Sequence, residues 1–175
     1  CWNRRPWFTP MVDDLDAFLA AERPSGAATR WINVDGLHPF TINRLRSKFP
    51  FHTLAGEDIV HVGQRAKVEP YDDHSFLVFR MLLLREGRLH DEQVSVVVFR
   101  DSVLTFQETA GDVWDPIRKR IENPASRLRA GGPAYLVYAL LDAIVDHFFP
   151  VLEHYGDRLE AVEQAIVERP SDEHL

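Results

Sequence analysis

The sequence predicts an α/β fold in which helices cover both faces of an antiparallel meander. From Lys67 onward, apolar residues recur with a period of two over several short segments, which is typical of antiparallel strands. Segments with helical spacing precede and follow these strands. The two central strands are apolar at nearly every position, so both faces of the sheet need a cover that these helices can supply.

The bulk composition limits the architecture and the partners. A chain of 175 residues can form one domain with a full core, with room for a helical extension. Its 27% charged and 45% apolar residues are those of a soluble globular protein. A net charge of −7 and a pI near 5.6 argue against nucleic acid as a partner and favour cations or basic surfaces. The only cysteine, Cys1, excludes an internal disulfide and is compatible with the cytoplasm.

The segments before the meander are predicted from spacing and turn residues. The first ten residues have no period and form an irregular lead-in without the apolar core of a secretory signal. Because the chain opens on Cys1, we expect its start to be a fragment boundary. The expected elements that follow are a helix from Asp13 to Glu22, a strand from Ala28 to Val34, and helices from His38 to Phe49 and from Thr53 to His61.

The meander is predicted as three or four strands. They occupy residues 67–72, 75–85, 92–100 and 102–108. Short turn-like pieces separate them at Asp73-His74, Glu86-Gly87-Arg88 and Arg100-Asp101.

Two helices are predicted after the meander. The first covers residues 111–123, with Asp115 as N-cap and Pro116 at the first helical position. The second is the longest helical stretch, from Pro133 to about Val167. Its first 20 residues have the length of a membrane span, but two aspartates near the middle would each cost about 2.5–3.5 kcal/mol. We therefore expect a buried helix of a soluble domain.

This long helix carries an acidic stripe. Five acids fall within roughly 60° on a helical wheel, namely Asp142, Asp146, Glu153, Asp157 and Glu160. Asp142 and Asp146 are one turn apart, and at about 6 Å and an effective dielectric of about 20 their carboxylates repel by roughly 3 kcal/mol. A bound Mg²⁺ would relieve this repulsion. Alternatively, the acids face water or meet a basic patch formed by Arg118, Lys119, Arg120, Arg127 and Arg129.

Other candidate sites are weaker. Glu57 and Asp58 are adjacent acids that diverge by about 100° on a helix, so they need a partner surface to chelate an ion, or they are simply a polar face. Glu69 and Glu92 could form a carboxylate pair, although solvation at a sheet edge is the simpler interpretation. Eight histidines include no HExxH motif, and no nucleophile elbow or glycine-rich phosphate loop is present. Nothing in the sequence favours an enzyme.

Several short motifs together carry a resemblance to a known family. They are Trp31-Ile32-Asn33-Val34-Asp35-Gly36-Leu37-His38, Glu57-Asp58-Ile59, Gln64-Arg65-Ala66-Lys67-Val68-Glu69, Glu92-Gln93-Val94-Ser95, Thr105-Phe106-Gln107-Glu108, Gly111-Asp112 with Asp115-Pro116, and Tyr135-Leu136 through Leu141-Asp142-Ala143 to Asp146. With them the chain resembles the N-terminal cytosolic domain of the CorA family of divalent-cation channels, from about Trp31 to Arg169. It departs from the family pattern at Thr53, Gly56 and Ala66.

The resemblance implies an α/β/α sandwich with a central mixed, largely antiparallel sheet and a long C-terminal helix. Residues 1–30 would be a lead-in with a short helix, 31–132 the α/β core, and 133–175 a long helix leading toward a stalk and two transmembrane helices that this sequence lacks. In the family, homopentamers form at the cytoplasmic face of the membrane, and the membrane is reached only through those C-terminal helices.

The resemblance also implies metal ligands. In the family, Mg²⁺ binds between neighbouring cytosolic domains and stabilises the closed pentamer, through acids that match Asp58, Glu57 and Asp142. Together with Asp146, which the charge argument adds, these residues are the predicted metal site, for regulatory Mg²⁺ or Co²⁺.

The leading hypothesis is therefore a Mg²⁺-sensing cytosolic domain of a CorA-like Mg²⁺/Co²⁺ channel. Two alternatives stay open. One is the cytosolic domain of a ZntB-like zinc transporter. The other is an assembly scaffold without metal, in which the acidic helix binds the basic patch of a neighbour.

Overall fold

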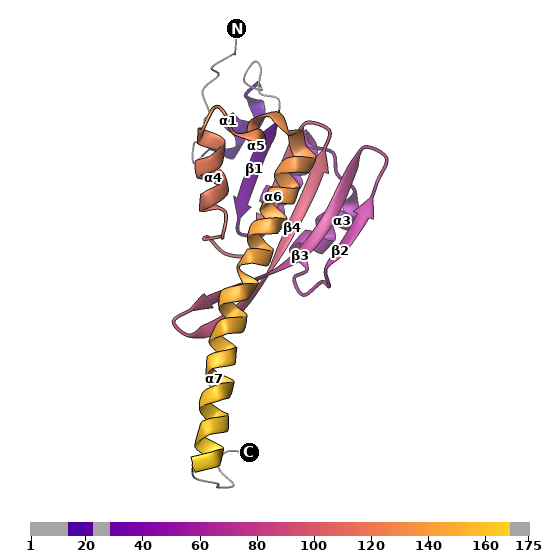
Figure 1. Ribbon diagram of the computed structural model, residues 1–175. Coiled ribbons are helices and arrows are strands. Elements are labelled where there is room, and N and C mark those ends of the chain that lie inside the picture. Colours follow the sequence, from indigo (N-terminus) through magenta and orange to yellow (C-terminus); the bar gives the residue numbers. More distant parts are fainter. Residues whose placement is uncertain (1–13, 23–28, 169–175) are drawn as a thin grey trace.

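The computed structural model describes residues 14–22 and 29–168 (Figure 1). The predicted lead-in of residues 1–10 and the predicted starts of elements at Asp13 and Ala28 lie outside these residues.

A five-stranded mixed sheet forms the centre of the domain. Its strands are β1 (Arg30–Asp35), β2 (Lys67–Pro70), β3 (His74–Arg85), β4 (Arg88–Phe99) and β5 (Ser102–Gln107). The order is β1-β5-β4-β3-β2, and only the β1–β5 pair is parallel. The predicted mixed, largely antiparallel sheet is therefore confirmed, although His74 begins β3 instead of lying in a turn.

The β3–β4 hairpin is the longest antiparallel pair. Its turn consists of Glu86 and Gly87, which have φ angles of 53° and 74°. Two consecutive left-handed residues are typical of the two-residue hairpin turn whose twist matches that of the strands. The predicted turn there is one residue shorter than expected, because Arg88 already belongs to β4.

Three helices cover one face of the sheet. They are α1 (Leu15–Ala20), α2 (Pro39–Lys48) and α3 (Thr53–Val60). Their apolar side chains share one core with the strands, including Leu45, Ile59, Phe76, Leu104 and Phe106. We call this side the α3 face.

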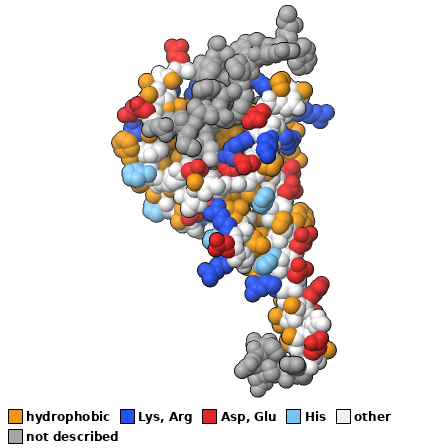
Figure 2. Space-filling model, turned by 90° about the vertical axis from the view of Figure 1, so that its left-hand side faces the viewer, with side chains coloured by type: hydrophobic (Ala, Val, Ile, Leu, Met, Phe, Trp, Pro, Cys, Tyr) orange, Lys and Arg blue, Asp and Glu red, His pale blue; other side chains and the backbone are white. Residues whose placement is uncertain are grey.

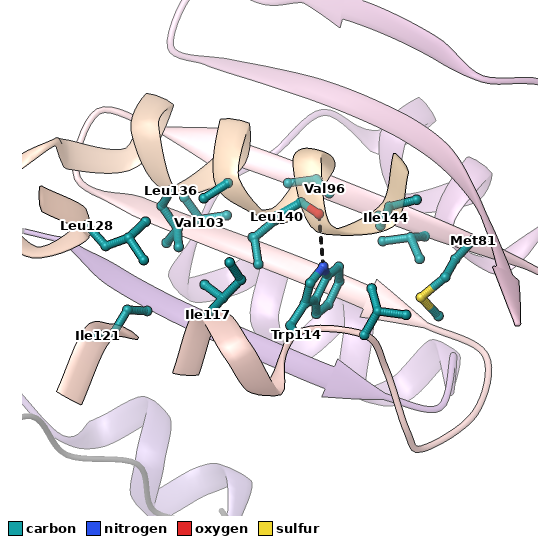
Figure 3. Packing of buried hydrophobic residues seen from close by; sticks show 13 residues of the cluster. Met81, Val96, Val103, Trp114, Ile117, Ile121, Leu128, Leu136, Leu140 and Ile144 are labelled. Atoms are coloured by element: carbon teal, nitrogen blue, oxygen red, sulfur yellow. Dashed lines mark hydrogen bonds between the residues drawn. The ribbon is translucent and has the colours of Figure 1, made fainter. Parts of the chain in front are cut away.

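The opposite face is covered by α4 (Asp115–Glu122), α5 (Arg127–Ala130) and α6 (Gly132–Asp146). Trp114 is completely buried at the centre of this second core and donates a hydrogen bond from Nε1 to the Leu140 carbonyl over 3.1 Å (Figure 3). We call this side the α6 face. With helices on both faces, the domain is the expected three-layer sandwich (Figure 1).

Two details of these helices differ from the prediction. Trp114 is the N-cap of α4, and Asp115 is its first residue, because the Asp112 carboxylate accepts the Trp114 N–H over 2.8 Å and already satisfies this end. The four-residue α5 was not predicted, since one helical turn leaves no periodic pattern in a sequence.

The long C-terminal helix is present but divided. The end of α6 and the start of α7 (Phe148–Glu168) meet at His147. The reason is Pro150, which has no N–H to donate to the carbonyl of Asp146. Beyond its first turns α7 projects away from the sandwich (Figure 1), and Asp and Glu side chains follow one edge of the projecting part (Figure 2).

Among the described residues, one stretch is long and apolar enough to cross a bilayer, namely Gly132–Glu168. In its first half, Leu136, Leu140 and Ile144 are buried against the sheet. Core packing therefore accounts for one apolar face of α6, as predicted, whereas Tyr138 and Val145 on the same helix are exposed.

Candidate functional site

The acid pair Glu57-Asp58 lies on α3. The helix begins after His52, whose Nδ1 accepts the Leu54 N–H over 3.2 Å. Ala55 and Ile59 are completely buried and fix which side of α3 faces the sheet. As a result Glu57 is exposed, whereas Asp58 lies at the rim of the helix beside β2.

Asp58 forms an ion pair with Lys67. The Lys67 ammonium lies 2.6 Å from Oδ2 of Asp58 and 2.7 Å from Oε1 of Glu69. The other oxygen of Glu69, Oε2, accepts a hydrogen bond from the Tyr71 hydroxyl over 3.1 Å. The side chains of Asp58, Lys67 and Glu69 are 24%, 28% and 35% exposed, so the three charges are only partly hydrated.

These contacts shift two pKa values. The hydrogen bond to Asp58, and then that to Glu69, raises the pKa of Lys67 above its ordinary value of 10.5. The hydrogen bond from Lys67 lowers the pKa of Glu69 below its ordinary value of 4.5. Each group is held in its charged form by the other.

A buried glutamine ties this end of α3 to the sheet. Gln93 of β4 is 1% exposed and donates from Nε2 to the main-chain carbonyl of Asp58 over 2.9 Å. Its Oε1 accepts the main-chain N–H of Gln64 over 2.9 Å. Its own N–H is donated to Oε1 of Glu108, also over 2.9 Å. The end of the helix that carries Asp58 is therefore fixed by side-chain hydrogen bonds from a central strand.

The other two predicted ligands lie elsewhere. Asp142 and Asp146 are exposed side chains of α6, on the face of the sheet opposite to α3. The structure thus separates the two predicted pairs by the sheet, because Glu57 and Asp58 lie on α3 and Asp142 and Asp146 lie one turn apart on α6. Within residues 14–22 and 29–168, no three His, Cys, Asp or Glu side chains are placed to share one metal ion.

The donor chemistry nevertheless suits a hard cation. Mg²⁺ takes carboxylate oxygens, often one or two from a protein, and keeps several waters. Each acid pair offers that number. Neither pair alone forms a complete site within the described residues, and Asp58 already binds Lys67, so a Mg²⁺ ion there would need further oxygens from water or from another copy of the chain.

Sequence reasoning missed the roles of Lys67, Glu69 and Gln93. The available signal was their position, because Lys67 and Glu69 are two apart on a strand and so share one face. Glu69 is paired with Lys67, and Glu92 is 6% exposed and accepts the Thr109 N–H over 2.8 Å. The interpretation of Glu92 as an acid solvated at a sheet edge was wrong, because β4 is a central strand.

One residue of the predicted basic patch, Arg118, forms ion pairs at the start of α4. Arg118 pairs with Asp112 over 2.7 Å and with Asp115 over 3.0 Å. Asp112 is 4% exposed, so this pair is a structural contact. Lys119 and Arg120 are exposed.

Comparisons with known proteins agree with this architecture. The chain is 39% identical over 172 residues to the cobalt/magnesium transport protein CorA of Thermotoga maritima, which covers 97% of this chain and 48% of that protein. It is 26% identical over 144 residues to the magnesium transporter ALR2 of Saccharomyces cerevisiae, covering 81% of this chain and 17% of the transporter. The chain spans about half the length, or less, of the curated relatives it matches.

Solved structures share the fold. The soluble domain of CorA from Methanocaldococcus jannaschii matches with a TM-score of 0.65 at 19% identity, over 82% of this chain and 58% of that one. The ZntB cytoplasmic domain from Vibrio parahaemolyticus matches with a TM-score of 0.53 at 16% identity, over 89% and 62%.

A family model described as the CorA-like Mg²⁺ transporter protein matches residues 26–175. This match covers most of the chain, and the close relative from T. maritima supports it independently. The chain therefore belongs to the CorA-like Mg²⁺ transporter family.

Proposed function

We propose that this chain is the cytosolic, Mg²⁺-sensing domain of a CorA-like transporter of Mg²⁺ or Co²⁺. In this proposal Glu57 and Asp58 of one copy supply some of the ligands of a regulatory Mg²⁺, and Asp142 and Asp146 of a neighbouring copy supply others. The full-length protein would be a homopentamer at the cytoplasmic face of the membrane, with no enzymatic role for this domain.

One observation carries the proposal. The two acid pairs lie on opposite faces of one sandwich, and three of the four carboxylates, those of Glu57, Asp142 and Asp146, are exposed. Two faces of one copy cannot share an ion, but the α3 face of one copy can meet the α6 face of the next. Head-to-tail contacts of this kind form a closed ring when the rotation between neighbouring copies divides a full turn evenly. A cation between the faces would offset the repulsion between their carboxylates.

Thermal unfolding with and without Mg²⁺ tests the sensing role. An ion that binds only the folded form at about 100 times its dissociation constant stabilises it by roughly 2.7 kcal/mol per site. We expect 10 mM Mg²⁺ to raise the melting temperature, and Asp58→Asn or Asp142→Asn to remove most of this rise. Asp157→Asn on the projecting part of α7 is the matched control and should keep it. The same melting temperature with and without Mg²⁺ would count against the proposal.

The two alternatives give different outcomes in the same experiment. A zinc transporter domain would respond to micromolar Zn²⁺ and not to Mg²⁺. A scaffold without metal would respond to neither ion, and charge reversal of Lys119 and Arg120 would disrupt its association. Arg118 is unsuitable for that reversal, because its loss would leave the buried carboxylate of Asp112 unpaired.

A further inference from the structure

Lys67 occupies the space between two carboxylates at the proposed sensing site. Its ammonium is within 2.7 Å of both Asp58 and Glu69, and its side chain passes over the ring of Phe76 with Nζ 5.7 Å from the ring centre. The contact holds the ammonium against the α3 face. Lys67 is thus a cation already bound to the carboxylate that the proposed function assigns to Mg²⁺.

A metal ion that binds Asp58 must compete with this ammonium. Both cations are attracted to the same carboxylate, and the lysine has the advantage of being attached to the chain. A lysine displaced from Asp58 without another partner would lose an ion pair at a position where its side chain is only 28% exposed, and this loss is a penalty against metal binding. Glu69 removes that penalty, because it binds the same ammonium from the other side.

Glu69 is itself fixed in position. It lies two residues from Lys67 on β2, so both side chains leave the strand on one face. Its second oxygen accepts the hydroxyl of Tyr71. The carboxylate is therefore held where it can retain the ammonium whether or not Asp58 binds another cation.

We propose that Lys67 is an internal competitor that sets the Mg²⁺ affinity of Asp58, and that Glu69 retains the ammonium when Mg²⁺ binds. This inference rests on the proposed function of Asp58. Neither residue contacts the metal. Lys67 weakens metal binding by competing for Asp58, and Glu69 permits it by holding the displaced ammonium.

Calorimetric titration of the whole chain with MgCl₂ tests this role. We expect Lys67→Met to bind Mg²⁺ about tenfold more tightly than wild type, because Asp58 loses its competing cation. We expect Glu69→Gln to bind it several-fold more weakly, because the ammonium then has only Asp58. Lys119→Met and Glu122→Gln on α4 make the same changes in net charge at exposed positions and should leave the affinity unchanged.

The lysine can also be observed directly. In ¹⁵N spectra of lysine side chains, the Lys67 signal of wild type should move as Mg²⁺ is added, and the same signal in Asp58→Asn should not. This measurement does not depend on how well a variant of Lys67 folds.

The outcomes separate this inference from the function on which it rests. One outcome is that Mg²⁺ binding requires Asp58 but is equally tight in wild type and Lys67→Met, and that the Lys67 signal does not move when Mg²⁺ is added. This outcome overturns the role of Lys67 and leaves the sensing function standing. Absence of Asp58-dependent binding in both proteins overturns both proposals.

Discussion

Gln93 in β4 donates a hydrogen bond from Nε2 to the main-chain carbonyl of Asp58 over 2.9 Å, which joins the centre of the sheet to the end of α3. The Asp58 carbonyl belongs to the last turn of α3, and the Gln64 N–H that Gln93 also binds lies in the connection from α3 to the edge strand β2. The position of the acid pair thus depends on one buried amide.

Replacing Gln93 by Leu should lower the free energy of unfolding by about 2–4 kcal/mol. Two partly buried main-chain groups would lose their partner, and each unsatisfied buried group costs about 1–3 kcal/mol. Urea unfolding at 25 °C measures the loss. Gln64→Ala is the control, because the hydrogen bond uses the main chain of Gln64, and its effect should stay within about 0.5 kcal/mol. Equal stability of wild type and Gln93→Leu would contradict the prediction.

The Lys67–Glu69 pair should make stability depend on pH at both extremes. A carboxyl group whose pKa is lowered in the folded state stabilises the fold at pH values above its unfolded pKa near 4.5. This stabilisation is lost as the pH falls through the folded pKa. An ammonium group whose pKa is raised in the folded state stabilises the fold at pH values below its unfolded pKa of 10.5. This stabilisation is lost as the pH rises through the folded pKa.

We therefore expect the difference in unfolding free energy between wild type and Lys67→Met to be constant between about pH 5 and pH 10 and to shrink on either side. Urea unfolding over a pH series measures it. A difference that persists unchanged well below pH 4 would show that the ion pair does not contribute.

Gly56 offers a stabilising substitution within α3. A Cβ at this position would lie 3.6 Å from Cε2 of Phe51 and 3.8 Å from Nη1 of Arg46, both ordinary contacts. Because glycine in a helix interior costs roughly 0.5–1 kcal/mol relative to alanine, Gly56→Ala should raise the unfolding free energy by about that amount.

Gly36→Ala provides the contrast in the same unfolding assay. Gly36 has a φ angle of 85°, in the left-handed region, so the same chemical change should destabilise the protein there. A loss of stability in Gly56→Ala would mean that Phe51 cannot accommodate the methyl group.

Much of the fold could be predicted from the sequence because periodicity determines it. The helical spacing in α2 and α6 corresponds to one buried face of each helix, and the nearly continuous apolar runs in β3 and β4 correspond to strands that are buried on both faces. What the sequence did not reveal depended on tertiary contacts. The N-cap of α4 moved to Trp114 because a carboxylate two residues earlier accepts its N–H. The single turn α5 is defined by packing of Leu128 into the core.

The candidate site was predictable only in part. The acids were visible in the sequence as adjacent or one-turn pairs on predicted helices, and each pair does lie on a helix, although Asp58 is half-buried and paired with Lys67. Their distribution over opposite faces followed from which helix covers which side, and no local pattern encodes that. The partner of Asp58 was also hidden, because Lys67 is nine residues away, on a strand whose neighbour in the sheet had to be known first.

The central claim is that the Mg²⁺ site lies between the α3 face of one copy and the α6 face of another. Mixing two variants tests it most directly, with sedimentation velocity as the readout. Asp58→Asn and Asp142→Asn should each fail to associate in 10 mM Mg²⁺, because every contact in either preparation lacks one ligand. An equal mixture should associate, because the intact α3 face of one variant can meet the intact α6 face of the other. A mixture that sediments like its separate components, while wild type associates with Mg²⁺, would contradict the claim.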